Sequence, residues 1–238
     1  MKITHKYILS ALLFFCLIIV TYFISNKQEV SQVKSVFNIA ELKGNCNIKE
    51  LNEKNEKYNI SVYFPESKYE DLNNTVTEKI NKYISDFRNE VEGLNNLENK
   101  EYELKITFNS CEYEEYISYV FEIFTDLGGA HPSTLIWTIS YDTKNNEVVD
   151  IKYLIANNKD ILNIMSKYAV NALKENDKIK ENYQKEMFSN GTSPTESNFS
   201  RFAFTKAGLK IYFEQYQIAP YSSGQFEVVI PYDELGIF

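Results

Sequence analysis

An uncharged and almost wholly apolar run, from Tyr7 to Ser25, lies close to the start of the chain. As an α-helix it would span about 28 Å at 1.5 Å per residue, close to the roughly 30 Å hydrocarbon layer of a bilayer. A helix packed on a soluble core keeps a polar face, and this run has none. Lys2 and Lys6 precede it without any acid, so the positive-inside rule places residues 1–6 in the cytoplasm. We therefore expect a transmembrane signal anchor at residues 7–25 and a single-pass membrane protein whose C-terminal domain is extracytoplasmic.

A cleavable signal peptide, which would leave a secreted protein, is the alternative. The apolar run is longer than the roughly 7 to 15 residues of a usual signal-peptide core, and no A-x-A-like site follows it. Cys16 follows two phenylalanines instead of the small residues of a lipoprotein site, so we interpret it as an apolar membrane residue.

The charge balance of the chain is acidic. It holds 33 acidic and 25 basic residues, and residues 1–26 contribute two lysines and no acid, so the remainder carries a formal charge of −10. Nucleic acid is an unsuitable partner for such a surface, whereas a cationic protein would be attracted to it. Two histidines leave little for a metal site, and we expect no cofactor.

The first half of the chain reads as a strand, a helix and then more strands. A polar linker at residues 26–56, with one short strand at most, precedes the strand at Tyr58–Phe64, which Pro65 ends. A capping box at Ser67–Glu70 opens a helix that Gly93 ends. The apolar stripe of this helix consists of Leu72, Val76, Ile80, Tyr83, Phe87 and Val91.

Alternation of apolar and polar residues then predicts strands at Tyr102–Phe108, Tyr119–Ile123 and Leu135–Ile139. A polar turn at residues 142–147 joins the last of them to Val148 and Val149, which is typical of an antiparallel meander.

The second half repeats this order of elements. Residues 150–176 have helical spacing, residues 175–200 are polar, and three closing strands follow at Phe202–Phe204, Leu209–Glu214 and Phe226–Ile230. The sequence therefore predicts an α+β fold with two similar lobes, each a helix packed on an antiparallel sheet. We place the lobes at residues 57–145 and 146–238.

The stretch from Asp126 to Ser133 is the most distinctive in the chain. Gly128 and Gly129 permit backbone angles closed to other residues, and Pro132 fixes the next angle. His131 lacks the second histidine, H-x-E or C-x-x-C pattern of a metal site, so we predict no metal. The simplest interpretation is a tight loop whose histidine bonds the backbone. The alternative is a cell-wall-modifying hydrolase that uses His131 as a general base.

A second loop, around Tyr216, Pro220 and Tyr221, ends in Ser222–Gly224. Exposed aromatic residues on a loop make good contacts to a protein or a sugar. The alternative is that these tyrosines cover a sheet edge with their hydroxyls in water. Trp137, the single tryptophan, completes the candidate ligand-binding residues.

Cys46 and Cys111 follow the predicted anchor, and an oxidising exterior allows them to form a disulfide. The alternative is two reduced thiols, since the sequence does not fix the distance between them. Glu112, Glu114 and Glu115 lack the calcium-loop pattern and read as a solvated strand face. No catalytic-serine, phosphate-loop, dinucleotide or zinc-protease motif occurs, so we predict no catalytic residues.

Residues 50 to 238 resemble the extracytoplasmic part of RsiV-type anti-sigma factors and the N-terminal region of PdaC-type peptidoglycan deacetylases. In those proteins a PdaC-like domain precedes a C-terminal RsiV-like domain of unknown function. The residues that carry the resemblance are Gly128–Pro132, Phe202–Phe204, Gly208–Ile211, Phe213, Tyr216, Ile218–Tyr221, Gly224 and Val229–Leu235.

The resemblance implies a cell-surface module of a Gram-positive bacterium, with lysozyme as the ligand of the RsiV-type relatives. Two departures limit what it implies. Only six residues precede the predicted anchor, so we expect no sigma-factor-binding segment. Nothing resembles the T-F-D-D-G-P-like metal motif of the deacetylase domain, so we expect no deacetylase activity. The expected function is therefore non-catalytic binding of a lysozyme-like protein or of peptidoglycan. A structural accessory domain for another partner is the remaining alternative.

Overall fold

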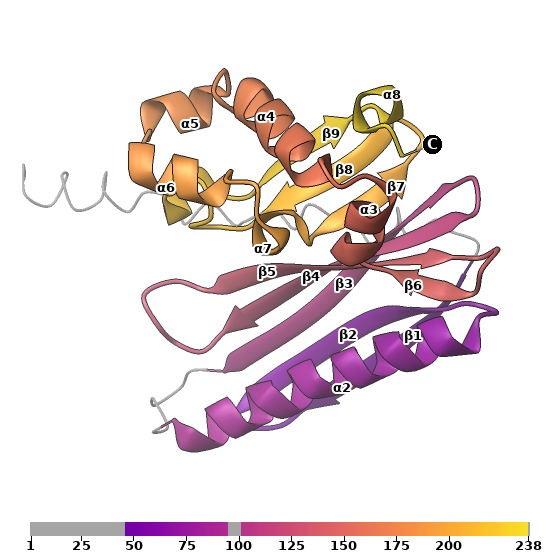
Figure 1. Ribbon diagram of the computed structural model, residues 1–238. Coiled ribbons are helices and arrows are strands. Elements are labelled where there is room, and N and C mark those ends of the chain that lie inside the picture. Colours follow the sequence, from indigo (N-terminus) through magenta and orange to yellow (C-terminus); the bar gives the residue numbers. More distant parts are fainter. Residues whose placement is uncertain (1–45, 95–100, 238) are drawn as a thin grey trace, which may run out of the picture. The chain divides into compact units, whose positions relative to one another are not determined.

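The computed structural model describes residues 46–94 and 101–237, and all of these residues lie in one unit of the chain (Figure 1). Within these ranges no helix is both long and apolar enough to cross a membrane. The predicted anchor at residues 7–25 and the predicted cytoplasmic tail at residues 1–6 lie outside the described residues, and so does Cys16. The membrane anchor therefore stays a prediction.

The larger of two sheets has six strands, which lie side by side in the order in which they occur in the chain. The strands are β1 (Asn47–Lys54), β2 (Tyr58–Glu66), β3 (Tyr102–Tyr113), β4 (Tyr116–Asp126), β5 (Ser133–Asp142) and β6 (Glu147–Val149). Every neighbouring pair is antiparallel except β2 and β3, which pair in parallel with Tyr58 opposite Tyr102. The predicted meander is therefore confirmed from β3 onward, whereas the strand–helix–strand unit before it makes a mixed sheet, because a crossover helix returns the chain in the same direction.

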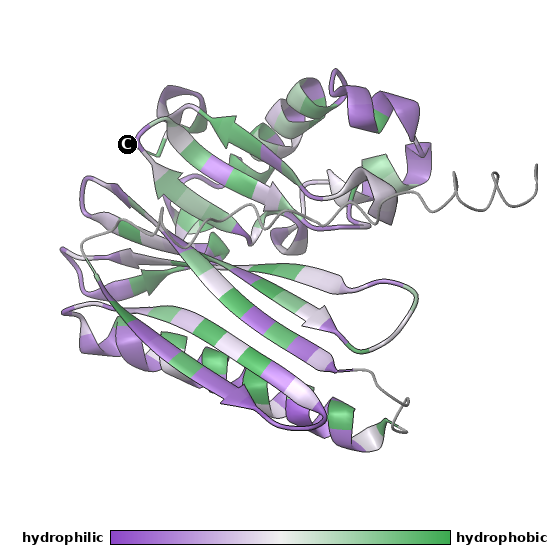
Figure 2. Cartoon of the chain, turned by 180° about the vertical axis from the view of Figure 1, so that it is seen from behind, coloured by the Kyte–Doolittle hydropathy of each residue, from purple (hydrophilic) through white to green (hydrophobic). Residues whose placement is uncertain are grey.

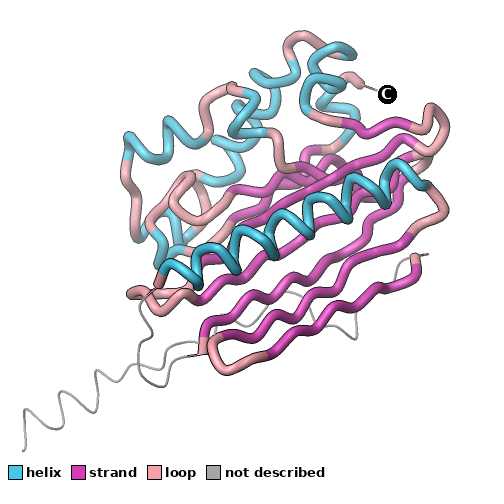
Figure 3. The backbone as a smooth tube through the Cα atoms, turned by 90° about the horizontal axis from the view of Figure 1, so that it is seen from below, coloured by secondary structure: helices cyan, strands magenta, loops and turns pink. Residues whose placement is uncertain are grey.

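The crossover is helix α2 (Glu70–Gly93), which lies along one face of the large sheet (Figure 3). Its buried residues are Leu72, Val76, Ile80, Ile84, Phe87 and Val91. Five of these six were predicted, and Ile84 takes the place of Tyr83, which is only partly buried. They pack against apolar side chains of β2 to β5, and this packing forms one of the two cores.

The start of α2 differs from the predicted capping box. Its N-cap position, Tyr69, makes no side-chain cap, and Glu70 does not reach back to Ser67. Instead the Asn73 side chain accepts from the Ser67 N–H at 2.8 Å and donates to the Ser67 carbonyl oxygen at 2.8 Å. An amide can both donate and accept, so Asn73 replaces the carboxylate of the predicted box.

Strand β1 lies within residues 26–56, the predicted linker. Its eight residues pair with β2 from Asn47 opposite Glu66 to Lys54 opposite Asn59. Most of its side chains are exposed, because it is an edge strand, and this polar character hides it from an analysis of alternation. The folded part thus begins before Lys57.

The smaller sheet is antiparallel and consists of β7 (Phe202–Thr205), β8 (Gly208–Phe213) and β9 (Phe226–Ile230), close to the three predicted closing strands. Its apolar residues share a second core with α3 (Ile151–Asn157) and α4 (Ile161–Leu173), which divide the helix predicted at 150–176. The remaining short helices are α5 (Asp177–Glu181), α6 (Lys185–Gly191), α7 (Glu196–Phe199), η2 (Tyr221–Ser223) and α8 (Tyr232–Leu235).

The two sheets meet through the edge of β7, which contacts β3, β4 and β5. The Phe202 N–H donates to the hydroxyl of Thr138 at 3.1 Å, and the Phe204 N–H donates to that of Ser118 at 3.0 Å. Polar side chains therefore lie buried on this face of the large sheet: Thr107, Ser118, Glu122, Thr134 and Ser140. Hydropathy alternates along the strands accordingly (Figure 2).

The α+β class is confirmed, but the two lobes are not alike. One joins a single long helix to a mixed six-stranded sheet, and the other joins several short helices to three strands. Val149, the last residue of β6, still belongs to the large sheet and also packs against the second core. The sheets therefore share an interface within one unit.

Candidate functional site

The two loops singled out in the sequence meet in the structure. The hydroxyl of Tyr221 donates to the carbonyl oxygen of Pro132 at 2.8 Å. The imidazole of His131 stacks on the Tyr221 ring, with 3.8 Å between centroids and 22° between planes. The hydroxyl of Tyr216 lies 3.5 Å from Nε2 of His131. We call these three side chains, His131, Tyr216 and Tyr221, the aromatic surface.

The first loop joins β4 to β5. Asp126, the last residue of β4, accepts a hydrogen bond from the Gly128 N–H at 2.8 Å, and Gly128 has a φ of +80°. This left-handed conformation is one that glycine adopts without steric cost, which explains the residue type here. Nδ1 of His131 lies 3.1 Å from the carbonyl oxygen of Pro132. The histidine therefore bonds the backbone, as the simplest interpretation of the sequence predicted. The neighbouring Gly129 is exposed.

The second loop joins β8 to β9 and begins with a β-turn. The Gln217 N–H donates to the carbonyl oxygen of Glu214 at 3.1 Å, and Tyr216 within this turn has a φ of +64°. Tyr216 is 55% exposed, so a large aromatic residue stands in water in a conformation that L-residues rarely adopt. Pro220 then leads into η2, whose first residue is the half-buried Tyr221.

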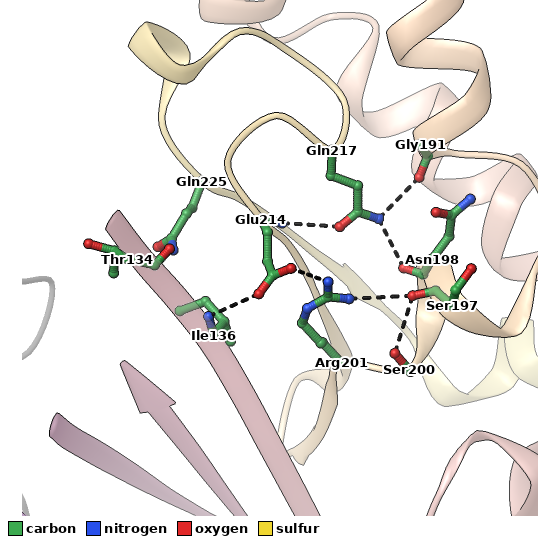
Figure 4. A network of polar contacts seen from close by, with 10 residues as sticks. All are labelled: Thr134, Ile136, Gly191, Ser197, Asn198, Ser200, Arg201, Glu214, Gln217 and Gln225. Carbon is green, nitrogen blue, oxygen red and sulfur yellow. Dashed lines mark hydrogen bonds and ion pairs between the residues drawn. The ribbon is translucent and has the colours of Figure 1, made fainter. Parts of the chain in front are cut away.

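A network of polar contacts holds the turn in place (Figure 4). The Gln217 side chain donates to the carbonyl oxygens of Gly191 and Asn198, both at 3.2 Å. Glu214 forms an ion pair with Arg201 and accepts from the Ile136 N–H of β5 at 3.3 Å.

A further side chain of the second loop, that of Gln225, donates to the Thr134 carbonyl oxygen of β5 at 3.1 Å. The sequence alone does not mark Glu214, Arg201, Gln217 or Gln225 as site residues. Their types are common on any surface, and only the fold brings them together. The one hint is that Glu214 and Gln217 bracket the exposed tyrosine within a single short motif.

Trp137 does not belong to the aromatic surface. Its neighbour Thr138 faces the small sheet, so Trp137 points to the other face of β5. There its ring stacks on Phe121 with 4.7 Å between centroids, beside the ammonium group of Lys79 at 5.9 Å. Trp137 is thus a partly buried member of the α2 core.

What the aromatic surface can do chemically depends on the groups beside it. The hydroxyl of Ser223, in the same loop, is buried and bonds to no described residue, so it is not paired with His131. Within residues 46–94 and 101–237, no group of three or more His, Cys, Asp or Glu side chains could hold a metal ion. What the described arrangement offers a ligand is two exposed rings, a third ring behind them, and the polar tips of Tyr216 and His131.

Cys46 and Cys111 are free thiols in the structure. Cys46 lies near Glu112 and Tyr119, whereas Cys111 lies near Lys210 of the small sheet. Because Cys111 and Glu112 are consecutive in β3, their side chains point to opposite faces, and so the two thiols lie on opposite sides of the large sheet. The disulfide that the sequence allowed is therefore not made. Burial raises the pKa of both thiols.

The comparisons with known proteins identify part of the chain. Residues 152–233 match the family model described as protein of unknown function DUF3298. The chain is also 27% identical over 189 residues to a curated Bacillus subtilis protein, the peptidoglycan-N-acetylmuramic acid deacetylase PdaC. That match covers 79% of this chain but only 40% of the relative.

Two solved structures share the fold. A DUF3298 family protein of Pseudomonas aeruginosa superposes with a TM-score of 0.58 at 15% identity, covering 82% of this chain and 95% of that one. A DUF3298 family member of Bacteroides fragilis gives 0.51 at 16% identity, covering 80% and 92%. At these identities the likeness concerns the fold alone. The predicted relation to PdaC and to a domain of unknown function is thus confirmed, and the relation to RsiV-type anti-sigma factors stays a prediction.

Proposed function

We propose that this protein is an extracytoplasmic, membrane-anchored module that binds peptidoglycan through the aromatic surface and does not transform it. The single observation that carries the proposal is the convergence of the two loops on His131, Tyr216 and Tyr221. Tyr216 and His131 are exposed, although burial of aromatic area is strongly favourable.

The chemistry of the surface suits a glycan strand. The flat faces of aromatic rings pack against the C–H faces of pyranose rings, and the Tyr216 hydroxyl and the His131 ring nitrogens can exchange hydrogen bonds with sugar hydroxyl and acetamido groups. Aromatic anchors of this kind supply most of the binding energy in many interfaces.

The comparisons support the choice of ligand and compartment. PdaC is named as a deacetylase that acts on peptidoglycan, and this chain matches a part of it that spans 40% of its length. Peptidoglycan lies outside the cytoplasmic membrane, which is where the predicted anchor at residues 7–25 would hold the domain.

A sedimentation assay tests the proposal. The purified full chain in mild detergent is mixed with insoluble peptidoglycan sacculi, and the bound fraction is measured against sacculus concentration. We expect saturable binding by the wild type and its loss in a His131→Ala/Tyr216→Ala double variant. Tyr183→Ala is the matched control, since Tyr183 is 54% exposed but lies between α5 and α6. Equal sedimentation of all three proteins would overturn the assignment of the site.

A lysozyme-like cationic protein is the second candidate ligand, and the formal charge of −10 over residues 27–238 favours it. Long-range attraction between opposite charges falls as salt rises, because the Debye length shortens from about 30 Å at 0.01 M to about 10 Å at 0.1 M. Calorimetric titration with hen lysozyme at these two salt concentrations should then show heat that weakens with salt. Stacking on a neutral glycan would change far less.

The hydrolase alternative predicts a different outcome. If His131 acted as a general base, sacculi incubated with the protein would release soluble fragments, and His131→Gln would abolish the release. For a binding module we expect no soluble fragments from either protein, measured by chromatography of the supernatant.

A further inference from the structure

We propose that Glu214 is a positioning residue of the aromatic surface. It fixes the turn that carries Tyr216 to the edge of β5. This inference rests on the proposed binding function, and it adds the element of the fold that sets the geometry of the site.

The outer edge of β5 is the starting point. One edge of this strand pairs with β4 along its whole length, but β6 covers the other edge only at Ser140–Asp142. Side chains of the second loop contact the uncovered part at alternate residues: Tyr221 at the Pro132 carbonyl, Gln225 at the Thr134 carbonyl and Glu214 at the Ile136 N–H. Alternate residues of a strand direct their backbone groups to the same edge. Three side chains therefore stand where a neighbouring strand would be.

Glu214 is the charged member of the three and bonds on two sides. One carboxylate oxygen pairs with the guanidinium of Arg201, and the other accepts from Ile136, 3.3 Å away. The side chains of Arg201 and Glu214 are only 23% and 20% exposed. Hydrogen bonds to an ionised partner are stronger than neutral ones, and partial burial reduces their screening by salt.

Glu214 also opens the turn that carries Tyr216. Its carbonyl oxygen accepts from the Gln217 N–H, and its own N–H donates to the Gln217 side chain at 3.1 Å. Between these two residues Tyr216 is held at a φ of +64°, a conformation that persists only where its surroundings determine it. Fixing Glu214 to β5 therefore fixes Tyr216 next to His131, whose own loop precedes the same strand.

Nuclear magnetic resonance measures this positioning without any ligand. The full chain contains two histidines, so the ring protons of His131 are resolved once a His5→Gln variant assigns the other. In a protein with protonated Tyr and His in a deuterated background, His131 should show cross-relaxation to both Tyr216 and Tyr221. Tyr216→Phe and Tyr221→Phe assign the two contacts.

We expect Glu214→Ala to remove the contact between His131 and Tyr216 while the contact to Tyr221, held by Pro132, remains. Glu214→Gln keeps an acceptor for Ile136 but loses the charge, and we expect it to weaken the Tyr216 contact only in part. Peptidoglycan affinity should fall about ten-fold in Glu214→Ala, which corresponds to roughly 1.4 kcal/mol. Glu53→Ala is the matched control, because it also breaks an Arg–Glu ion pair, with Arg88, in another part of the fold.

An unchanged Tyr216 contact in Glu214→Ala would overturn the positioning role, and so would a lost contact with unchanged affinity. If the Ala variant does not fold, the same two measurements on Glu214→Gln decide. If the wild type itself binds no peptidoglycan, the proposed function fails, and the resonance measurement still decides whether Glu214 places Tyr216.

Discussion

The backbone N–H of Phe204 donates a hydrogen bond to the hydroxyl oxygen of Ser118, 3.0 Å away on the other sheet. Ser118 is fully buried, and its oxygen lies 2.8 Å from the hydroxyl oxygen of Ser140. The Phe204 N–H, at the edge of the small sheet, thus finds in a pair of buried hydroxyls the acceptor that a neighbouring strand would otherwise provide.

Ser118→Ala should therefore lower the free energy of unfolding by more than the removal of a buried hydroxyl that accepts no backbone hydrogen bond. The Phe204 N–H would stay buried without an acceptor, which costs about 1–3 kcal/mol. Denaturant unfolding followed by circular dichroism measures the change. Ser222→Ala, at an exposed position, is the control and should stay within about 0.5 kcal/mol of the wild type.

Gly191→Ala should be severely destabilising. A Cβ at Gly191 would overlap the backbone carbonyl of Gln217, and backbone cannot rotate away as a side chain can. We expect the free energy of unfolding to fall by about 4–5 kcal/mol, a loss that is exceptional for a single substitution. Thermal unfolding checks this against Gly93→Ala, where nothing lies within 4 Å of the added carbon. Equal melting temperatures for the two variants would contradict the close approach of α6 to the second loop.

Tyr216→Asn should separate binding from stability. Asparagine tolerates a positive φ better than tyrosine, so unfolding should require up to about 1 kcal/mol more free energy. The exposed ring is lost, and sedimentation with sacculi should fall to background. Tyr216→Phe keeps the ring and should bind. A Tyr216→Asn protein that still sediments would show that the ring makes no contact with the wall.

Alkylation should find both described cysteines reduced and slow to react. Burial is the main cause that raises the pKa of the Cys46 and Cys111 thiols, so at pH 8 the folded protein holds less thiolate than a free cysteine does. Iodoacetamide followed by mass spectrometry should label both slowly in the folded state and rapidly after unfolding without reductant. Labelling that requires a reductant would reveal a disulfide.

Glu53 should contribute to stability at neutral pH and lose that contribution in acid. The hydrogen bond from Tyr58, followed by that from Arg88, lowers the Glu53 pKa below its ordinary value of 4.5. A lowered folded-state pKa gives stability that is present above the unfolded pKa and is lost as the pH falls through the folded one. The stability difference between wild type and Glu53→Gln should accordingly shrink between about pH 5 and pH 3, within the range over which carboxylates titrate. A difference independent of pH would contradict this account.

The fold was predictable wherever one side of an element is apolar. The stripe of α2 and the three closing strands follow from periodicity, because burial against a single core imposes it. The prediction for residues 26–56 allowed one short strand at most and did not place the eight residues of β1, because an edge strand with exposed side chains carries no such pattern. The burial of Ser118 and Ser140 was equally hidden, since a polar face under a second sheet reads like a face in water.

The candidate site was predictable in part. His131, Tyr216 and Tyr221 stood out by residue type and by their glycine and proline neighbours, and the structure brings all three together. Trp137 stood out for its type alone, and the parity of β5 directs it to the other face. Whether two loops that are far apart in the sequence come together depends on how the two sheets pack. Periodicity within one element carries no information about that packing.

The parallel pairing of β2 with β3 has a consequence for the order of events in folding. β1–β2 and β3–β6 are each built from hairpins between strands that follow one another in the chain, so each can form early at little cost in loop entropy. The two halves can join only when the long helix between them has docked and brought Tyr58 opposite Tyr102. We expect that pulse-labelled hydrogen exchange would show amides of β3 to β5 protected before the β2–β3 seam closes, so that the seam is the last part of the large sheet to gain protection.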